Sequence, residues 1–146
     1  MNLKFIRRAF LLCMLALPLC AGNAYAQVDD ATLAKRESRK NLVVKEWNTD
    51  AKAKTKWLDR VTTYDEQGRK IEEIEYTKVG QKWRETFEYG TNGRVVKNTV
   101  YDERDKVVQV RKFEYNTDGT KKKQFNYTPS GKLETIKVFE YSTTKE

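Results

Sequence analysis

The chain has 146 residues, with 29 lysines and arginines against 21 aspartates and glutamates, which gives a formal net charge of +8. It contains no histidine, and its two cysteines are Cys13 and Cys20. This composition excludes the common nucleophile–base pairs and the usual zinc sites. The sequence also has neither a glycine-rich phosphate loop nor a DxDxDG calcium loop, so we expect no cofactor and no metal.

Residues 1–26 have the layout of a secretory signal peptide. Basic residues at positions 4, 7 and 8 precede an apolar stretch that ends at about Leu19, and Ala24-Tyr25-Ala26 provides a small-x-small site. We therefore expect cleavage after Ala26 and a periplasmic or secreted protein without a transmembrane span. A retained anchor and a lipoprotein are the alternatives. The apolar stretch is short for the first, and Leu19 stands where lipoprotein signals carry a small residue.

Cleavage would leave 120 residues, 27–146, with 26 basic and 21 acidic side chains and a net charge of +5. That chain would contain no cysteine and thus no disulfide. Its length predicts a single domain. Its 37 residues of the AVILMFWYC set are enough to cover one face of a sheet but predict a thin core.

Tyrosines recur at intervals of 12 to 14 residues: Tyr64, Tyr76, Tyr89, Tyr101, Tyr115, Tyr127 and Tyr141. A four-residue stretch follows each of the first six, namely DEQG, TKVG, GTNG, DERD, NTDG and TPSG. Five stretches end in glycine and one ends in Asp105. This pattern predicts hairpin loops built around type I turns, with a left-handed residue near the end of each loop.

The runs between these loops have the pattern of strands. WRETFEY (83–89) alternates cleanly between the two faces, whereas RKIEEIEY (69–76) does not, and a bulge would account for the difference. LVVKEWN (42–48) and KWLDRVTTY (56–64) predict two further strands. Residues 27–41 are polar and predict an N-terminal arm or a short helix.

Strands joined by tight turns are antiparallel, so the true period is a hairpin of 25 or 26 residues. The phrase FEY recurs with that period at 87–89, 113–115 and 139–141. Residues 42–146 therefore predict an all-β fold, a single-domain up-and-down meander of about eight antiparallel strands in a twisted or curled sheet. Whether the sheet closes is left open. Each tyrosine is expected to shield the last cross-strand pair and keep its hydroxyl in water; a ligand-binding role is the alternative.

YDEQGRKIEEIEY (64–76) resembles the YD-type repeat of Rhs proteins, with its Tyr-Asp pair, turn glycine, basic residue and strand. The later repeats keep the tyrosine and mostly lose the aspartate. The layout of signal peptide and Tyr–turn–Gly hairpins is similar to a family of small secreted Bacteroides-type proteins, a domain of unknown function. This resemblance implies an exported β-meander and transfers no functional residue.

A basic run supplies the first candidate site. Along an ideal strand, Lys121 and Lys123 share a face with Phe125 and Tyr127, while Lys122 points to the other face. Aromatic rings beside ammonium groups can bind anionic polymers. Export excludes nucleic acid and favours an anionic glycan, an envelope polymer or an acidic protein surface. The alternative is a solvated strand whose lysines prevent edge pairing.

Trp57 and Trp83 form the second candidate site, because they lie on strands that are expected to be two apart. On an exposed face such a pair could stack on a sugar ring, and otherwise the two rings belong to the core.

Glu88, Glu114 and Glu140 occupy equivalent positions about 9.6 Å apart on alternate strands. This spacing lies near the upper end of the window of about 6.5–9.5 Å for inverting glycosidases. The repeat alone generates the spacing, and pairing of these carboxylates with lysine or arginine explains it more simply. We therefore expect no catalytic site.

These observations favour an exported, noncatalytic binding or envelope-associated module that uses an aromatic and basic sheet face. A structural protein that associates through its sheet edges is the first alternative, and a small glutamate-based hydrolase is the second. The sequence does not define the oligomeric state.

Overall fold

The computed structural model describes residues 30–52 and 54–144, so the signal peptide expected at 1–26 lies outside the described residues. One short helix precedes eight strands. The elements are α1 (Asp30–Glu37), β1 (Val43–Thr49), β2 (Lys56–Tyr64), β3 (Lys70–Thr77), β4 (Gly80–Tyr89), β5 (Val95–Tyr101), β6 (Val107–Tyr115), β7 (Lys121–Tyr127) and β8 (Leu133–Val138). The helix occupies the region for which an arm or a short helix was expected.

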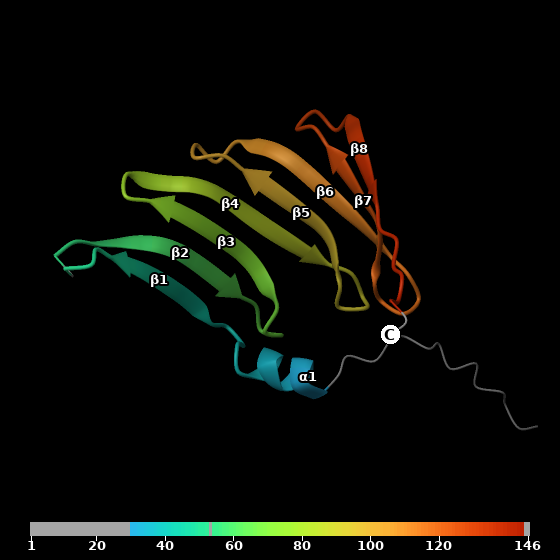
Figure 1. The fold of residues 1–146 in the computed structure, drawn as a ribbon, viewed down its shortest axis with the longest axis horizontal. Coiled ribbons are helices and arrows are strands. Elements are labelled where there is room, and N and C mark those ends of the chain that lie inside the picture. Colours follow the sequence, from blue (N-terminus) through green and yellow to red (C-terminus); the bar gives the residue numbers. More distant parts are fainter. Residues whose placement is uncertain (1–29, 53, 145–146) are drawn as a thin grey trace, which may run out of the picture.

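All eight strands belong to one sheet, and their order in space is their order in the sequence. Every neighbouring pair is antiparallel. The predicted all-β up-and-down meander is therefore confirmed. The sheet is open, with β1 and β8 at its two edges, and its strands turn progressively from β1 to β8 (Figure 1).

Five of the six loops after tyrosines have the predicted turn. In the first, the amide of Gly68 donates to the carbonyl of Asp65, and the amide of Asp65 donates to the carbonyl of Arg69. The residue that closes each turn has positive φ, including Asp105 at 59°. An aspartate side chain reinforces the first turn, because Asp65 Oδ1 accepts hydrogen bonds from the amides of Gln67 and Arg69.

The loop at 77–80 departs from the prediction. Thr77 and Gly80 pair directly across β3 and β4, so the loop consists only of Lys78 and Val79. The hydroxyl of Thr77 accepts a hydrogen bond from the amide of Val79 and so stabilises the shorter turn. The glycine here begins β4, with φ at 142°, and does not close a four-residue turn.

A register shift precedes every tyrosine from Tyr64 to Tyr127. At the first, Thr63 pairs with Glu72 and Tyr64 pairs with Lys70, which leaves Ile71 as an extra residue. This bulge explains the irregular alternation of residues 69–76. Because a slip of one residue exchanges the two faces, each bulge changes which side chains lie together.

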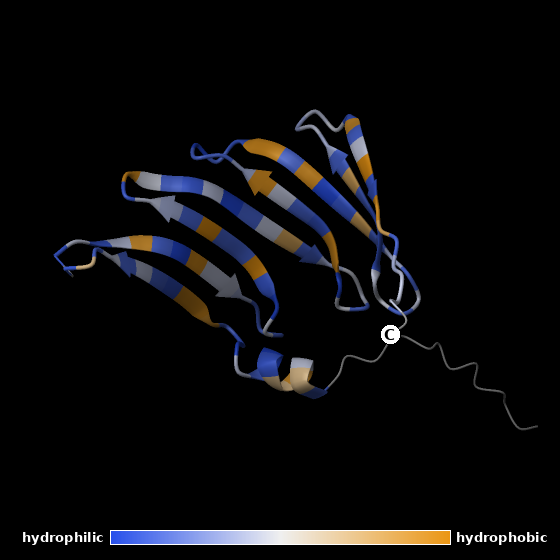
Figure 2. Cartoon of the chain, viewed as in Figure 1, coloured by the Kyte–Doolittle hydropathy of each residue, from blue (hydrophilic) through white to orange (hydrophobic). Residues whose placement is uncertain are grey.

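The sheet is a single layer, and its interior is even thinner than expected. None of the described hydrophobic side chains is buried, whereas the polar residues Thr62, Asn98 and Thr99 are. Hydrophobic and hydrophilic residues alternate along the strands (Figure 2). The edge strand β8 is exposed along its whole length. Contacts between neighbouring strands therefore stabilise this fold more than a central core does.

Candidate functional site

Two cavities lie on the same face of the sheet. We call this the cavity face, and cross-strand pairing places on it Thr62, Glu73, Glu85, Asn98, Arg111 and Gln124. The first cavity has a volume of about 470 Å³ and lies between α1 and strands β1–β4. The second has a volume of about 280 Å³ and lies over strands β4–β7. The first volume is in the range of small-ligand sites, about 300–1,000 Å³, and the second lies just below it.

Cationic side chains dominate the first cavity. Its lining consists of Thr32, Lys35, Arg36, Arg39, Glu46, Thr62, Tyr64, Gly68, Arg69, Lys70, Glu73 and Tyr89. Five of these residues are basic and two are acidic. The carboxylate of Glu73 is already paired with the ammonium of Lys70 at 3.0 Å. The guanidinium of Arg69 is likewise paired with the carboxylate of Asp65 at 2.7 Å. The excess positive charge that favours an anion in this cavity therefore comes from Lys35, Arg36 and Arg39.

Helix α1 contributes its basic face to this cavity. Thr32, Lys35 and Arg36 of α1 line the cavity together with Arg39 from the turn that follows the helix, while Leu33 lies outside it with 50% of its surface exposed. A helix held by hydrophobic packing would turn Leu33 toward the sheet. This orientation is better suited to presenting cations.

Close backbone contact holds α1 in place. A Cβ atom at Gly68 would lie 1.8 Å from the carbonyl oxygen of Arg36, so only glycine allows this approach. The guanidinium of Arg36 also donates to the carbonyl of Gly93 at 3.3 Å. The helix thus contacts the turn between β2 and β3 and the turn between β4 and β5, which lie at the same end of the strands.

Tyrosine rings form the sheet side of the first cavity. The guanidinium of Arg39 lies 5.2 Å from the centre of the Tyr64 ring, and that of Arg69 lies 4.7 Å from the Tyr89 ring. The Tyr89 hydroxyl donates to the carbonyl of Lys70 at 2.8 Å. Burial raises the pKa of Tyr89, against the opposing effect of the Arg69 charge. The hydroxyl is therefore bound to the backbone, although the sequence predicted a hydroxyl in water.

The second cavity is more aromatic. It is lined by Glu85, Phe87, Val95, Asn98, Arg111, Phe113, Tyr115, Lys121 and Gln124. The ammonium of Lys121 lies 4.8 Å from the centre of the Phe113 ring. The Tyr115 hydroxyl donates to the carbonyl of Val95 at 2.7 Å, which repeats the Tyr89 contact one hairpin later. Burial also raises the pKa of Tyr115.

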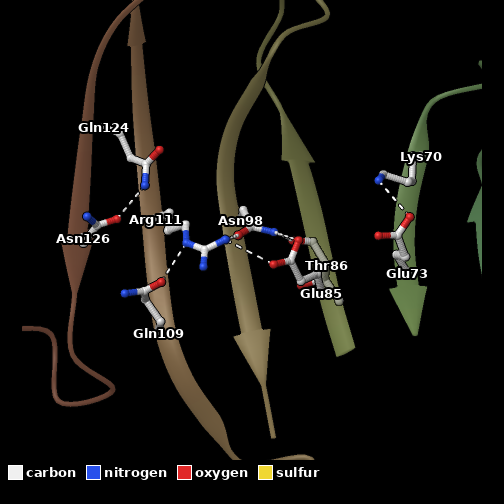
Figure 3. Close-up of polar contacts among 9 residues, drawn as sticks. All are labelled: Lys70, Glu73, Glu85, Thr86, Asn98, Gln109, Arg111, Gln124 and Asn126. Atoms are coloured by element: carbon white, nitrogen blue, oxygen red, sulfur yellow. Dashed lines mark hydrogen bonds and ion pairs between the residues drawn. The ribbon is translucent and has the colours of Figure 1, made fainter. Parts of the chain in front are cut away.

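A polar network crosses the middle of the cavity face (Figure 3). Arg111 donates to Glu85 at 3.1 Å, to Asn98 at 3.2 Å and to Gln109 at 2.7 Å. Asn98 in turn donates to Glu85 at 3.2 Å. These contacts neutralise Glu85 and fix the guanidinium, so the network builds a rigid floor and leaves no free carboxylate at its centre.

The structure separates the lysines of the basic run. Lys121 pairs with Tyr115, and Lys123 pairs with Glu114, so the bulge between them sends them to opposite faces. Lys121 lies at the second cavity. Lys123 and Phe125 lie on the opposite face, where the ammonium of Lys112 is 5.3 Å from the Tyr127 ring. The expectation that Lys121 shares a face with Lys123, Phe125 and Tyr127 was therefore wrong.

Trp57 on β2 and Trp83 on β4 lie on strands two apart, as expected, and neither lines a cavity. Both rings are half-buried. The ammonium of Lys78 lies 4.3 Å from the Trp57 ring, while Trp83 pairs with Glu75 across β3 and β4. The structure thus does not bring Trp57 and Trp83 to the cavities.

The repeated glutamates are engaged in pairs or lie at the chain end. Glu88 forms an ion pair with Lys97 at 2.7 Å, and Glu114 lies opposite Lys123. Glu140 follows β8 and is exposed. Within the part of the chain that the structure describes, no group of histidine, cysteine, aspartate or glutamate residues could hold a metal ion.

Sequence reasoning missed the cations of α1 and the turn that follows it. Lys35, Arg36 and Arg39 stand in the polar segment that the sequence assigned to an arm or a short helix. The spacing of Thr32 and Arg36 was the available signal, because residues four positions apart lie on one side of a helix.

Comparisons with known proteins found no matching family model and no matching curated protein. Among solved structures, the chain is similar to part of an S. aureus TarM mutant crystallised with fondaparinux, alpha-GlcNAc-glycerol and UDP. The identity is 15%, the match covers 75% of this chain and 22% of that chain, and the TM-score is 0.28. A likeness at this level bears on neither the fold nor the function of this chain.

Among residues 30–52 and 54–144, no helix has the length and apolar character needed to cross a membrane.

Proposed function

We propose that this protein is an exported, noncatalytic binding module and that its cavity face holds an anionic glycan of the cell envelope. The observation that carries the proposal is the first cavity, where α1 turns a basic face toward the sheet. Lys35, Arg36 and Arg39 meet Arg69 and Lys70 there, on a wall that also contains two tyrosine rings.

Anionic sugars fit both features of this wall. A carboxylate or sulfate accepts charge-assisted hydrogen bonds from ammonium and guanidinium groups. The apolar face of a sugar ring packs on an aromatic ring. The signal peptide expected at residues 1–26 would bring the chain to a compartment where such polymers are accessible and nucleic acid is not.

The carboxylates on the cavity face support a noncatalytic role. Glu73 is paired with Lys70, and Glu85 is bound by Arg111 and Asn98. The same contacts suit a surface that binds and does not react.

The experiment measures binding of the exported protein to polygalacturonate, with neutral dextran as the control polymer, by isothermal titration calorimetry at low and moderate salt. We expect saturable binding to polygalacturonate that weakens as salt screens the charges. A variant with Lys35→Gln and Arg39→Gln should lose about tenfold in affinity.

A matched variant with Lys106→Gln and Lys132→Gln removes the same charge from exposed turns at the other end of the strands. It should keep its affinity within about twofold, a difference of roughly 0.4 kcal/mol. Equal losses in the two variants would mean that net charge and not the first cavity binds the polymer. Equal binding of dextran would also contradict the proposal.

A further inference from the structure

The two cavities are related by the hairpin repeat of the chain. Thr62, Lys70, Glu73 and Tyr89 line the first cavity. The residues 25 or 26 positions later are Phe87, Val95, Asn98 and Tyr115, and all four line the second cavity. The second cavity is therefore the first cavity repeated one hairpin further along the sheet.

The two cavities also adjoin each other across β4. Tyr89 lines the first and Phe87 the second, and both side chains project from β4 to the cavity face. The ammonium of Lys70, which lines the first cavity, lies 4.7 Å from the centre of the Phe87 ring. A ligand that runs across the strands can therefore contact both cavities without leaving the surface.

The same two contacts hold a tyrosine ring in each cavity. The hydroxyls of Tyr89 and Tyr115 bond to the first residue of the preceding strand, at 2.8 and 2.7 Å. An arginine from the preceding turn lies over each ring, Arg69 at 4.7 Å and Arg94 at 5.5 Å. The repeated rings are fixed before any ligand arrives, which lowers the entropic cost of binding.

The side chains that line the two cavities differ in chemistry. The first is cationic, with the basic face of α1 opposite the sheet. The second contains Phe87, Phe113 and Tyr115, with Lys121 at its margin as an exposed cation. The first thus suits an anionic group, and the second suits a sugar ring that carries one further anionic group.

We propose that the two cavities are successive subsites for one linear glycan that carries a carboxylate on every second sugar and lies across the strands. Two strands separate equivalent positions, a distance of about 9.6 Å. This distance is close to the length of one disaccharide. One disaccharide would fill each subsite, with one carboxylate facing the cations of the first cavity and the next facing Lys121 of the second. The inference rests on the proposed function and adds the period and direction of the ligand.

The experiment uses size-defined hyaluronan fragments of two, four, six and eight sugars, because hyaluronan carries one carboxylate on every second sugar. Affinities for the exported protein are measured by isothermal titration calorimetry. We expect a step of at least about tenfold in affinity between the disaccharide and the tetrasaccharide, and only small gains beyond the tetrasaccharide. A gradual rise with length and no step would overturn the two-subsite proposal.

Two adjacent lysines provide a matched pair of variants. Lys121→Gln removes the cation of the second cavity, and Lys122→Gln removes an equal charge from the neighbouring residue that does not line it. Lys121→Gln should weaken tetrasaccharide binding about tenfold. It should leave disaccharide binding, which the first cavity provides, unchanged. Lys122→Gln should leave both affinities unchanged.

The outcomes distinguish the two proposals. If Lys35→Gln weakens hexasaccharide binding and Lys121→Gln does not, the binding function stands and the second subsite is wrong. If no fragment binds and polygalacturonate does not bind either, both proposals are wrong. If polygalacturonate binds while every hyaluronan fragment fails, the function stands and the proposed carboxylate period is wrong.

Discussion

The two ends of the strands use the same tyrosine in different ways. At the end nearest α1, which we call the helix rim, the tyrosines are Tyr64, Tyr89, Tyr115 and Tyr141. The hydroxyls of Tyr89, Tyr115 and Tyr141 each donate to the backbone carbonyl of the first residue of a strand, which is β3, β5 or β7 respectively. At the opposite end, the far rim, the tyrosines are Tyr76, Tyr101 and Tyr127. Among the described residues, none of these three hydroxyls has a hydrogen-bond partner.

The difference lies in what surrounds each ring. At the helix rim, arginines from the turns, including the turn that follows α1, lie over the rings and beside the cavities. At the far rim, the cations over Tyr101 and Tyr127 come from the middle of strands, Arg84 at 3.8 Å and Lys112 at 5.3 Å. One repeated residue therefore fixes the walls of the cavities at one rim and covers strand ends at the other.

The largest expected difference between the rims comes from two turn glycines with similar backbone angles. Gly68 at the helix rim has φ of 67°, and Gly131 at the far rim has φ of 85°. Alanine in either conformation costs about 1–2 kcal/mol. At Gly68 the new Cβ would also meet the backbone of Arg36, whereas at Gly131 nothing lies within 4 Å. Overlap of this kind adds about 1–3 kcal/mol unless α1 leaves the sheet.

Urea denaturation of Gly68→Ala and Gly131→Ala measures this difference, and binding of polygalacturonate reports the position of α1. Gly68→Ala should be the less stable variant or should lose binding of polygalacturonate at the first cavity. Gly131→Ala should keep that binding. Equal stability and equal binding in the two variants would mean that α1 does not lie on Gly68.

A smaller difference is expected from removing single hydroxyls. Tyr115→Phe deletes the bond to the carbonyl of Val95 and should lower the free energy of unfolding by about 1 kcal/mol. Tyr127→Phe removes a hydroxyl that has no hydrogen-bond partner among residues 30–52 and 54–144, and it should change the free energy of unfolding by less than about 0.5 kcal/mol. Chemical denaturation of both variants tests the contrast. A larger loss for Tyr127→Phe would contradict the distinction between the rims.

The smallest effect is expected at alkaline pH. Burial raises the pKa of Tyr89 and of Tyr115 in the folded protein, so the neutral form is favoured there. Their contribution to stability is complete below the unfolded pKa of about 10 and is lost as the pH rises through the higher folded pKa. The free energy of unfolding should therefore fall above about pH 10.

Spectroscopic titration of tyrosinate absorbance shows which tyrosines have the raised pKa values. Replacing Tyr89 and Tyr115 by phenylalanine should remove the late part of the titration and flatten the alkaline loss of stability. Replacement of Tyr101 and Tyr127 serves as the control. If the control variant removes the late part instead, the assignment of the raised pKa values to Tyr89 and Tyr115 is wrong.

The sequence predicted the meander well because its signals are local. Regular tyrosines and turn-closing residues such as Asp105 define strand ends wherever the rest of the chain lies. The loop at 77–80 was mispredicted because its glycine resembles the others, although Lys78 and Val79 alone connect the strands.

The candidate site was harder to predict because bulges decide the faces. The period-two rule placed Lys121 with Phe125, and one extra residue in β7 sent it to the other face. The cations of α1 were missed for a different reason. Lys35 and Arg39 gain their role only when Gly68 allows the helix to approach the sheet, and that contact joins segments about thirty residues apart in the chain.

The single-layer sheet also has a consequence for how stability depends on temperature. Exposure of apolar surface raises the heat capacity on unfolding, while exposure of polar surface lowers it. None of the described hydrophobic side chains is buried here, and the buried residues Thr62, Asn98 and Thr99 are polar. The heat-capacity change of unfolding should therefore be small for a chain of this length. The stability curve should be correspondingly flat, so that cooling and moderate warming alter the folded fraction little.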